Sequence, residues 1–446
     1  MKTTLKLDSN KIIQPIKPMN AVNNGPTRPR SSQSRGNFES YSAAGFPYAR
    51  THDANLCFNY GAPHTVDITA IFPNFDADED DPASYDFVLT DEYIKTILES
   101  GTKVFYRLGQ SIEHSKKKYG VLPPKDFNKW ARICEHIILH FNEGWADGYH
   151  YGIEYWEIWN EPDLNQEDFT KSPTWQGTKE QFFDLYEIAS KHLKSKFPNL
   201  KIGGPALAWL RDWAADFLSE MQRRNVPIDF FSWHRYDKNP RRVGEICDIF
   251  REMLDKNGYT RTESILNEWN YLRNWDVEFV YSLQSITGIK GASYATAMMC
   301  VCQNKPLDML MYYDARIGAV WNGLFDIISL RPGKTYYPYL AFHQLSLLGN
   351  EVALECDNPN IYTVAASDGN QTQLLISYYN EEDILSAENV ELTFCADYDG
   401  ELRFYLTDEK KDHELVRTIE FSKGEQSIQV PLQLFDIYHI ILENKL

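Results

Sequence analysis

The chain of 446 residues is 43% hydrophobic, 24% charged and 14% aromatic, and its formal net charge at pH 7 is −18. This length exceeds what one ordinary hydrophobic core supports, so we expect one large domain and one smaller domain. A surface this acidic repels phosphate backbones and anionic lipids, which argues against a nucleic-acid partner and a membrane partner.

The start of the chain and its cysteines bear on the compartment. The first eight residues lack the apolar segment of a signal peptide, and no apolar run approaches the roughly 20 residues of a membrane helix. We therefore expect a cytoplasmic protein, or a periplasmic or secreted one if a leader has been removed. The seven cysteines lack CxxC spacing, so we expect reduced thiols rather than disulfides or a zinc site.

Strand-like and helix-like stretches alternate from about residue 40 to residue 313. The expected strands are 46–53, 102–108, 155–161, 201–206, 228–236, 264–268 and 307–313. The expected helices are 90–100, with Thr90 as N-cap, and 127–142, 178–196, 212–225, 244–257 and 276–289. About eight such βα units in roughly 300 residues predict a parallel (β/α)8 barrel, hence an α/β fold.

The two ends of the chain depart from this alternation. Residues 1–18 alternate weakly and contain prolines, which favours an edge strand. After residue 350, short strands separated by turn residues predict an antiparallel β-sandwich. We therefore expect three parts: an N-terminal strand segment at 1–18 that packs on the sandwich, the (β/α)8 barrel at 19–345, and the accessory sandwich at 346–446.

Two of the expected barrel strands each end in an Asn-Glu pair. Residues 155–163 read Tyr-Trp-Glu-Ile-Trp-Asn-Glu-Pro-Asp, where Pro162 should stop the strand and hold Glu161 in extended geometry. Residues 264–270 carry Glu268 to a strand end in the same way. A barrel gathers the C-terminal ends of its strands in one bowl, and two carboxyl groups are what glycosidic bond cleavage uses. Two glutamates alone are a weak signal among 63 acidic residues.

The surrounding residues strengthen that signal. Residues 156–163 resemble the Asn-Glu-Pro signature of the clan A glycoside hydrolases, in the form found in family 39, which includes β-xylosidases and α-L-iduronidases. Three more stretches are similar to motifs of that family in the same order. They are Arg-Thr-His-Asp (50–53), Ser-Trp-His-Arg-Tyr (232–236) and Leu-Asn-Glu-Trp (266–269). The resemblance covers about residues 40–345.

The resemblance implies a role for each of these side chains. Glu161, at the end of the fourth barrel strand, is the expected acid/base, and burial and a nearby anion should raise its pKa. Glu268, at the end of the seventh, is the expected nucleophile and should stay ionised beside donors from Tyr236 and Arg50. Asn160 would bind the sugar 2-hydroxyl. The other expected substrate-binding residues are His52, Asp53, His234, Trp269 and Trp321. On the residues alone, a structural role is the better interpretation for each histidine, and core packing is an equally good interpretation for Trp321.

The function implied is that of a retaining exo-glycoside hydrolase acting by double displacement through a glycosyl-enzyme intermediate. A β-xylosidase-like activity on plant-type oligosaccharides is the first expectation, with no metal and no cofactor. The same fold would also serve a β-glucoside, an arabinoside or a uronide such as α-L-iduronide. A uronide needs a cation, for which Arg316, Lys238 and Arg331 are candidates. Residues 54–86 and 312–316 do not match a xylosidase closely and are expected to select the sugar.

Two alternatives and two imitations of metal sites remain to be weighed. The alternative from a different functional class is a barrel that binds carbohydrate without catalysing a reaction. The sequence leaves open whether the chain forms a homo-oligomer. His136 and His140 are spaced as zinc ligands but lack the Glu of HExxH. Residues 76–81 imitate an EF-hand opening but have Asp81 in place of its glycine. We expect a structural histidine pair and a solvated loop.

Overall fold

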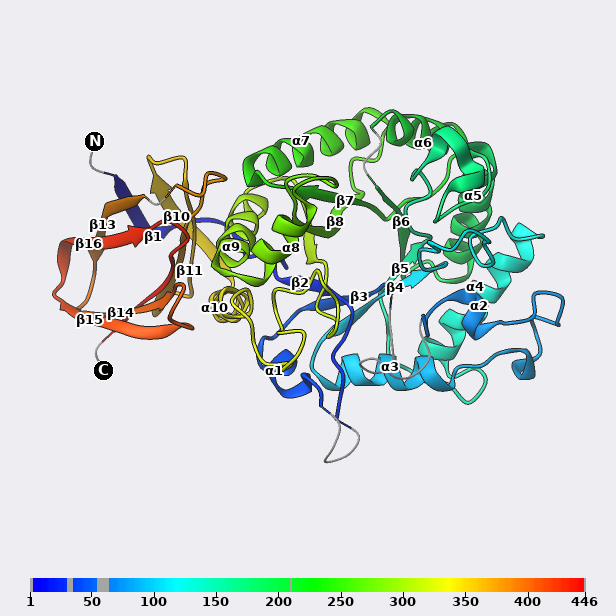
Figure 1. The fold of residues 1–446 in the computed structure, drawn as a ribbon, viewed down its shortest axis with the longest axis horizontal. Helices are drawn as coiled ribbons and strands as arrows, with labels where there is room; N and C mark the ends of the chain where they lie inside the picture. The colour runs from blue at the N-terminus through cyan, green and yellow to red at the C-terminus, as the bar shows by residue number, and fades with distance from the viewer. Residues whose placement is uncertain (1–2, 30–34, 54–63, 209–210, 385, 445–446) are drawn as a thin grey trace.

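The computed structural model describes residues 3–29, 35–53, 64–208, 211–384 and 386–444. It confirms the predicted fold class, because a closed parallel barrel is accompanied by a separate, mostly antiparallel sheet. Figure 1 shows the barrel with its helices on the right and the sheet, which carries both chain ends, on the left. Cys57 and residues 54–63 of the predicted sugar-selecting loop lie outside the described residues.

The barrel is closed by parallel strands that follow one another in chain order. They are β2 (Ala21–Asn23), β3 (Tyr48–Thr51), β4 (Lys103–Leu108), β5 (Tyr155–Ile158), β6 (Lys201–Leu207), β7 (Phe230–Asp237), β8 (Glu263–Tyr271) and β9 (Met309–Tyr312). Their residues are nearly all buried, because helices cover the outside and side chains fill the inside. Glu161 thus follows the fourth strand and Glu268 lies on the seventh, as predicted.

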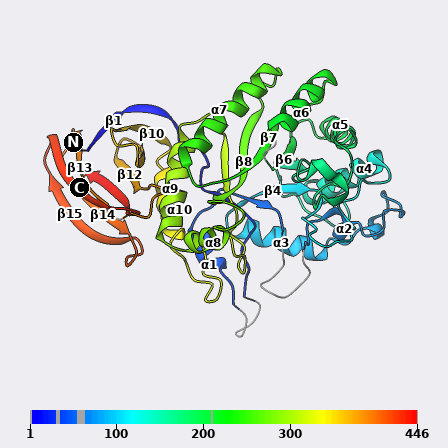
Figure 2. The same cartoon turned by 45° about the horizontal axis from the view of Figure 1, so that its top comes forward.

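The helices surround the barrel, and the last two lie between the barrel and the sheet (Figures 1 and 2). They are α1 (Phe38–Ala43), α2 (Ile68–Ile71), α3 (Val88–Glu99), α4 (Phe127–Glu143), α5 (Lys179–Lys196), α6 (Arg211–Arg223), α7 (Pro240–Lys256), α8 (Phe279–Thr287), α9 (Ile289–Gln303) and α10 (Tyr336–Ser346), with 3-10 turns η1 (Pro82–Ser84) and η2 (Gln166–Lys171). None of the helices in the described ranges combines the length and the apolar character needed to cross a bilayer.

Helix α3 begins two residues before the predicted start, and Thr90 is not its N-cap. The Asp86 carboxylate accepts a hydrogen bond from the Val88 N–H at 3.2 Å, at the true start of the helix. Thr90 instead lies inside the first turn, where its hydroxyl donates to the Thr65 carbonyl at 2.5 Å. The N-cap position itself is occupied by Phe87, whose side chain makes no capping hydrogen bond, so neither Thr90 nor Asp86 is the N-cap.

The accessory unit is one continuous sheet in the order β15-β14-β17-β12-β11-β10-β1-β13-β16. Its strands are β1 (Thr4–Pro15), β10 (Asn350–Cys356), β11 (Ile361–Ser367), β12 (Gln371–Tyr378), β13 (Ala387–Ala396), β14 (Gly400–Thr407), β15 (Glu414–Phe421), β16 (Gly424–Gln433) and β17 (Ile437–Asn444). The sheet curls over on itself (Figure 1), so that Leu5, Val390, Leu402 and Ile440 share one core. A single curled sheet therefore forms the layers expected of a sandwich.

Strand β1 brings the N-terminal segment into the middle of this sheet. It pairs antiparallel with β10 and, over residues 4–6, parallel with β13. The prediction of an edge strand is therefore wrong, and the sheet is not wholly antiparallel. The reason is that Leu5 and Leu7 on one face of β1 are needed by the core, where both are buried.

Candidate active site

A cavity of about 750 Å³ opens at the rim formed by the C-terminal ends of the barrel strands. It is lined by both predicted carboxylates and by Asp53, His234, Tyr236 and Trp321. Tyr313 and Arg316, from the stretch 312–316 that was expected to select the sugar, also line it, whereas the lining residues His114 and Trp275 were not predicted. A second cavity of about 790 Å³ shares Leu164 and Ala208 with the first, so the two adjoin along that wall.

A sharp turn after β5 places Glu161 at this rim. The strand ends at Ile158, and both Trp159 and Glu161 have positive φ angles, of 73° and 49°. The predicted extended geometry of Glu161 is therefore wrong. Its N–H donates to the Ala206 carbonyl at 2.8 Å and its carbonyl accepts from the Thr174 hydroxyl at 2.6 Å. Such a backbone conformation costs about 1–3 kcal/mol, which these contacts offset.

A bulge in β8 turns Glu268 toward the same place. Trp233 of β7 lies opposite Leu266, but the next residue, His234, lies opposite Glu268, so Asn267 is an extra residue in β8. Bulges of this kind re-aim side chains beside active sites. The Asn267 amide consequently reaches the barrel interior, where it donates to Glu157 at 2.5 Å.

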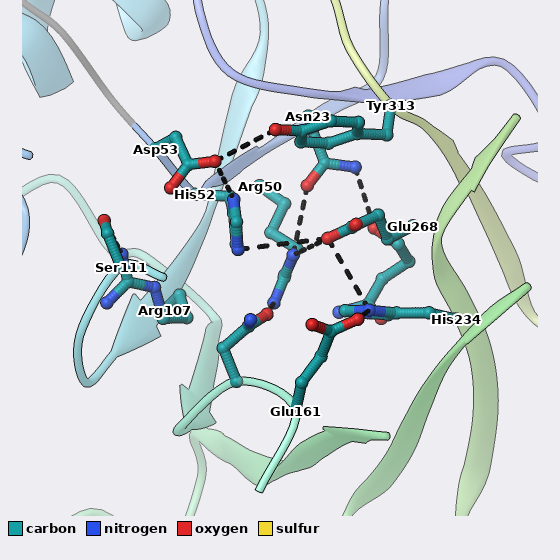
Figure 3. Close-up of polar contacts among 12 residues, drawn as sticks. Asn23, Arg50, His52, Asp53, Arg107, Ser111, Glu161, His234, Glu268 and Tyr313 are labelled. Carbon is teal, nitrogen blue, oxygen red and sulfur yellow. Dashed lines mark hydrogen bonds and ion pairs between the residues drawn. The ribbon is translucent and has the colours of Figure 1, made fainter. Parts of the chain in front are cut away.

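The two carboxylates meet around His234, as Figure 3 shows. The Glu161 carboxylate lies 2.8 Å from His234 Nδ1, and Glu268 accepts a hydrogen bond from the Tyr236 hydroxyl at 2.7 Å. Arg50 Nη1 donates to the other Glu268 oxygen at 3.4 Å. One oxygen of each carboxylate and a ring nitrogen of His234 lie within 4.8 Å of one another.

This set of three side chains is also the group in the described ranges whose ligand atoms could converge on a metal ion. The guanidinium of Arg50 beside Glu268 adds a positive charge that opposes a cation there. The hydrogen bonds from Tyr236 and Arg50 occupy carboxylate oxygens that a metal would need. The arrangement fits proton transfer and nucleophilic attack better than metal binding.

Burial raises the pKa of both carboxyl groups. It raises the pKa of Glu161 to about 7, with help from the Asp53 anion and against the effect of Arg50. It also raises the pKa of Glu268 to about 7, helped by Glu161 and opposed by His234, Arg50 and Tyr236. The expectation that Glu268 is simply ionised is therefore too strong, because its pKa lies close to that of Glu161. Glu268 accepts more hydrogen bonds than Glu161, which favours the ionised form of Glu268 and the protonated form of Glu161.

Arg50 supports the pair from beneath and is fully buried. Its Nε donates to the Glu157 carboxylate and its Nη2 to the side-chain oxygen Oδ1 of Asn160, both at 2.7 Å, and its Nη1 donates to Oδ1 of Asn23 at 3.2 Å. Asn160 Nδ2 has no partner among the residues described, which leaves a buried donor available to a ligand. Sequence reasoning missed the roles of Glu157 and Asn23. The one signal for Glu157 is a charge between Trp156 and Ile158 inside a buried strand.

His52 and Asp53 form the opposite side of the site (Figure 3). His52 Nδ1 lies 3.0 Å from the Asp53 carboxylate, which also accepts from the Tyr313 hydroxyl at 2.9 Å. Against the effect of burial, His52, Arg316 and Tyr313 hold the pKa of Asp53 well below its usual range. Burial lowers the pKa of His52 to about 3. The cavity therefore contains a permanent anion beside a neutral imidazole.

The two tryptophans that were predicted to bind substrate, Trp321 and Trp269, differ in whether they face the cavity. Trp321 lines the cavity, and its ring centroid lies 5.0 Å from that of Tyr236. Trp269 does not face the cavity: it is fully buried against Tyr312 and against Tyr294 of α9. Its assignment to substrate binding is wrong, because strand alternation turns the residue after Glu268 toward the surrounding helices.

The side chains that imitate metal sites have hydrogen-bond partners within the chain. His140 contacts Asp91 at 2.8 Å and the Trp145 carbonyl at 2.9 Å, and His136 contacts the Arg132 carbonyl at 2.9 Å. In the acidic loop, Asp81 accepts a hydrogen bond from the Ala83 N–H at the start of η1. Each of these groups is held by a local partner.

Comparison with known proteins identifies the family. The chain matches the family described as glycosyl hydrolases family 39 over residues 5–299. A β-xylosidase from Geobacillus stearothermophilus is 32% identical over 208 residues, which are 43% of this chain and 36% of that protein. A β-xylosidase from Caldicellulosiruptor saccharolyticus is 29% identical over 207 residues, 43% of this chain and 37% of that protein.

Both curated matches thus span little more than a third of the relative's length. Among solved structures, a glucosidase from Croceicoccus marinus has a TM-score of 0.83 at 20% identity, with 100% of this chain and 99% of that chain covered. That likeness shows a common fold. Because the family match extends over well more than half of the sequence, the chain belongs to glycosyl hydrolase family 39.

Proposed function

We propose that this protein is a retaining glycoside hydrolase that removes one terminal sugar, with Glu161 as acid/base and Glu268 as nucleophile. The observation that carries the proposal is the approach of the two buried carboxylates, one oxygen of each within 4.8 Å. Retaining enzymes hold their carboxyl groups about 5–5.5 Å apart, and inverting enzymes about 6.5–9.5 Å apart to admit a water. The close approach supports direct attack by Glu268.

The first step of the proposed reaction uses the proton that burial retains on Glu161. Glu161 gives this proton to the glycosidic oxygen while a Glu268 oxygen attacks the anomeric carbon. The bond to the leaving group breaks and an ester to Glu268 forms. Tyr236 and Arg50 hold the Glu268 oxygens in position for the attack.

The second step reverses these roles. Glu161 has given its proton to the leaving group and Glu268 is held as an uncharged ester, so the Glu161 carboxylate now serves as a base. It takes a proton from water, the oxygen of that water attacks the anomeric carbon, and the ester bond breaks to restore the Glu268 carboxylate. Two displacements on one carbon leave its configuration unchanged.

A neutral sugar suits the charges of the cavity better than a uronide. Asp53 adds a fixed anion to the wall, which would repel a sugar carboxylate. Arg316, the one lining residue among the three candidate cations, lies 3.3 Å from Asp314 and donates to the Asp53 carbonyl at 2.5 Å. We propose a β-D-xyloside first, as in the named β-xylosidase relatives, and a β-glucoside second. The adjoining cavity would receive the rest of an oligosaccharide.

A panel of nitrophenyl glycosides tests the proposal with the variants Glu161→Gln and Glu268→Gln. The wild type should hydrolyse the β-D-xyloside or β-glucoside and leave the α-L-iduronide intact. Loss of the nucleophile should lower kcat by about 10⁴-fold. NMR of the first sugar released should show the β anomer, and net inversion would refute attack by Glu268. Tight sugar binding without any turnover would instead favour the non-catalytic barrel.

A further inference from the structure

We propose that residues 379–383 of the accessory sheet are a positioning element of the active site. This clamp segment, which follows β12, would hold the β8–α8 loop (residues 272–278) so that Trp275 forms one wall of the substrate cavity. The inference rests on the glycosidase function proposed above. It assigns the accessory sheet a task beyond completing the fold.

The clamp segment engages the loop through Arg273. The guanidinium Nε contacts the Glu381 carboxylate, while Nη2 reaches the Asp383 carboxylate at 3.0 Å and the Glu381 carbonyl at 3.1 Å. The remaining nitrogen, Nη1, donates to Glu278 in the same loop at 3.1 Å. All three guanidinium nitrogens are thus bonded, and such multiple charge-assisted contacts fix a geometry that a lone surface pair does not.

The same two acids bind the helices behind the loop. Asp383 accepts from Lys290 of α9 at 2.7 Å and from the Tyr281 hydroxyl of α8. The Tyr271 hydroxyl, at the end of β8, lies 3.3 Å from both Glu381 oxygens. The clamp segment therefore joins the end of β8 to the two helices that follow it.

Contact with β7 extends the reach of the clamp segment to the neighbouring strand. The Tyr379 hydroxyl donates to the Lys238 carbonyl, just beyond β7, at 2.7 Å. Tyr236 and Glu268 lie on these same two strands, only two and three residues before the points that the segment holds. The position of the accessory sheet is thereby coupled to the nucleophile and its hydrogen-bond donor.

Trp275 is the residue through which this support reaches the substrate. It lines the cavity, and its ring centroid lies 5.2 Å from that of Tyr236 and 5.6 Å from that of Trp321. Because Trp275 is 64% exposed, core packing does not fix its place. Its place depends on the loop, which is bonded within itself through Asn274 and to the sheet through Arg273.

The chain offers a matched control for this contact. Lys334 and Asp412 also join the barrel to the sheet, at 2.7 Å, with side chains 20% and 49% exposed. Arg273 and Asp383 are 18% and 46% exposed. The two pairs are similarly exposed, but within the described ranges Lys334 and Asp412 form no hydrogen bond or ion pair with the β8–α8 loop that carries Trp275.

The test compares Glu381→Gln and Asp383→Asn with the control Asp412→Asn. In steady-state kinetics, kcat/KM of Glu381→Gln and Asp383→Asn should be about tenfold lower than that of the wild type. The main change should be a higher KM, because the cavity wall formed by Trp275 contacts substrate and transition state alike. The control should stay within about twofold of the wild type. Asp383→Glu, which keeps the charge, should recover part of the loss.

A second readout does not depend on turnover. In protein labelled with 5-fluorotryptophan, the ¹⁹F resonance of Trp275 is identified by its loss in Trp275→Phe. It should shift or broaden in Glu381→Gln and Asp383→Asn and stay unchanged in Asp412→Asn. If the Trp275 resonance is the same in Glu381→Gln and Asp383→Asn as in the wild type, the inference is wrong. It is also wrong if kcat/KM of these two variants equals that of the control Asp412→Asn. If the wild type hydrolyses no glycoside, the proposed function fails while the ¹⁹F spectra still decide this inference.

Discussion

Two carboxyl groups with similarly raised pKa values differ in their neighbours. Glu268 accepts from Tyr236 and Arg50, whereas the described side chains give Glu161 a single such contact, with His234. Hydrogen bonds to the charged form of a carboxyl group lower its pKa. The proposed division of labour, with Glu161 as acid and Glu268 as nucleophile, therefore depends on two donors that belong to other strands.

Removal of one donor tests this division. The substitution Tyr236→Phe deletes the hydroxyl that bonds Glu268 at 2.7 Å. A hydrogen bond to a charged group is worth about 1.5–3 kcal/mol, so the acidic limb of the kcat/KM profile should move up by about one pH unit or more. The pH dependence of kcat/KM measures the shift. An acidic limb that stays in place would show that Tyr236 does not govern the ionisation of the nucleophile.

The raised pKa values also predict how the site affects stability. A carboxyl group whose folded pKa is about 7, against 4.5 when unfolded, favours folding below pH 4.5 and loses that contribution as the pH rises toward 7. Glu161→Gln, which is neutral at every pH, should therefore be about 3 kcal/mol more stable than the wild type at pH 8. At pH 4 the two should be nearly equal. Thermal unfolding at both pH values measures this, and equal midpoints at pH 8 contradict the prediction.

The sequence predicted those site residues that lie in motifs, but not those whose place depends on tertiary contacts. The motif residues Glu161, Glu268 and Tyr236 do meet at one cavity. Trp269 follows Glu268 in sequence, yet strand alternation buries it on the side of the strand that faces away from the cavity. Trp275, six residues further on, lines the cavity because the loop that carries it folds back toward the rim of the barrel. No local sequence pattern predicts how such a loop folds.

Among the elements, the unpredicted ones are those without a periodic pattern. Helix α9 was missed because it is buried almost all round and so lacks a polar face at helical spacing. Strand β2 has only three residues, and β15 is largely exposed and rich in charge. The barrel strands with long apolar runs were predicted. Their order and closure followed from the alternation of strand and helix rather than from any single segment.

Strand β1 allows a prediction at the scale of an element. Leu5 is 0% exposed in the core that both halves of the sheet share, whereas Ile12 on the same strand is 63% exposed. Leu5→Ala should destabilise the sheet by about 2–5 kcal/mol and Ile12→Ala by less than about 0.5 kcal/mol. Thermal unfolding compares the two variants directly. Equal effects would mean that β1 is held by its backbone pairing rather than by its apolar side chains.

At the scale of the whole molecule, the sheet covers a surface that the barrel cannot leave exposed. Helix α9 packs on β11 and β12, where Ser293 contacts Ser377 at 2.8 Å and the ring of Tyr294 lies 5.5 Å from that of Tyr379. The first strand, β1, and the last strand, β17, belong to the same sheet, so segments from both halves of the sequence cover the barrel helices together (Figure 1).

A shortened chain of residues 17–346 tests whether the barrel can stand without this cover. It would expose the sheet-facing side of α9 and release Arg273 and Lys290 from Glu381 and Asp383. Exposed apolar patches of this kind promote association. The fragment should therefore aggregate, or unfold at a temperature well below that of the full chain. Size-exclusion chromatography and thermal unfolding measure both. A monomeric fragment that unfolds at the temperature of the full chain would mean that the sheet only adds to the barrel and does not help to hold it.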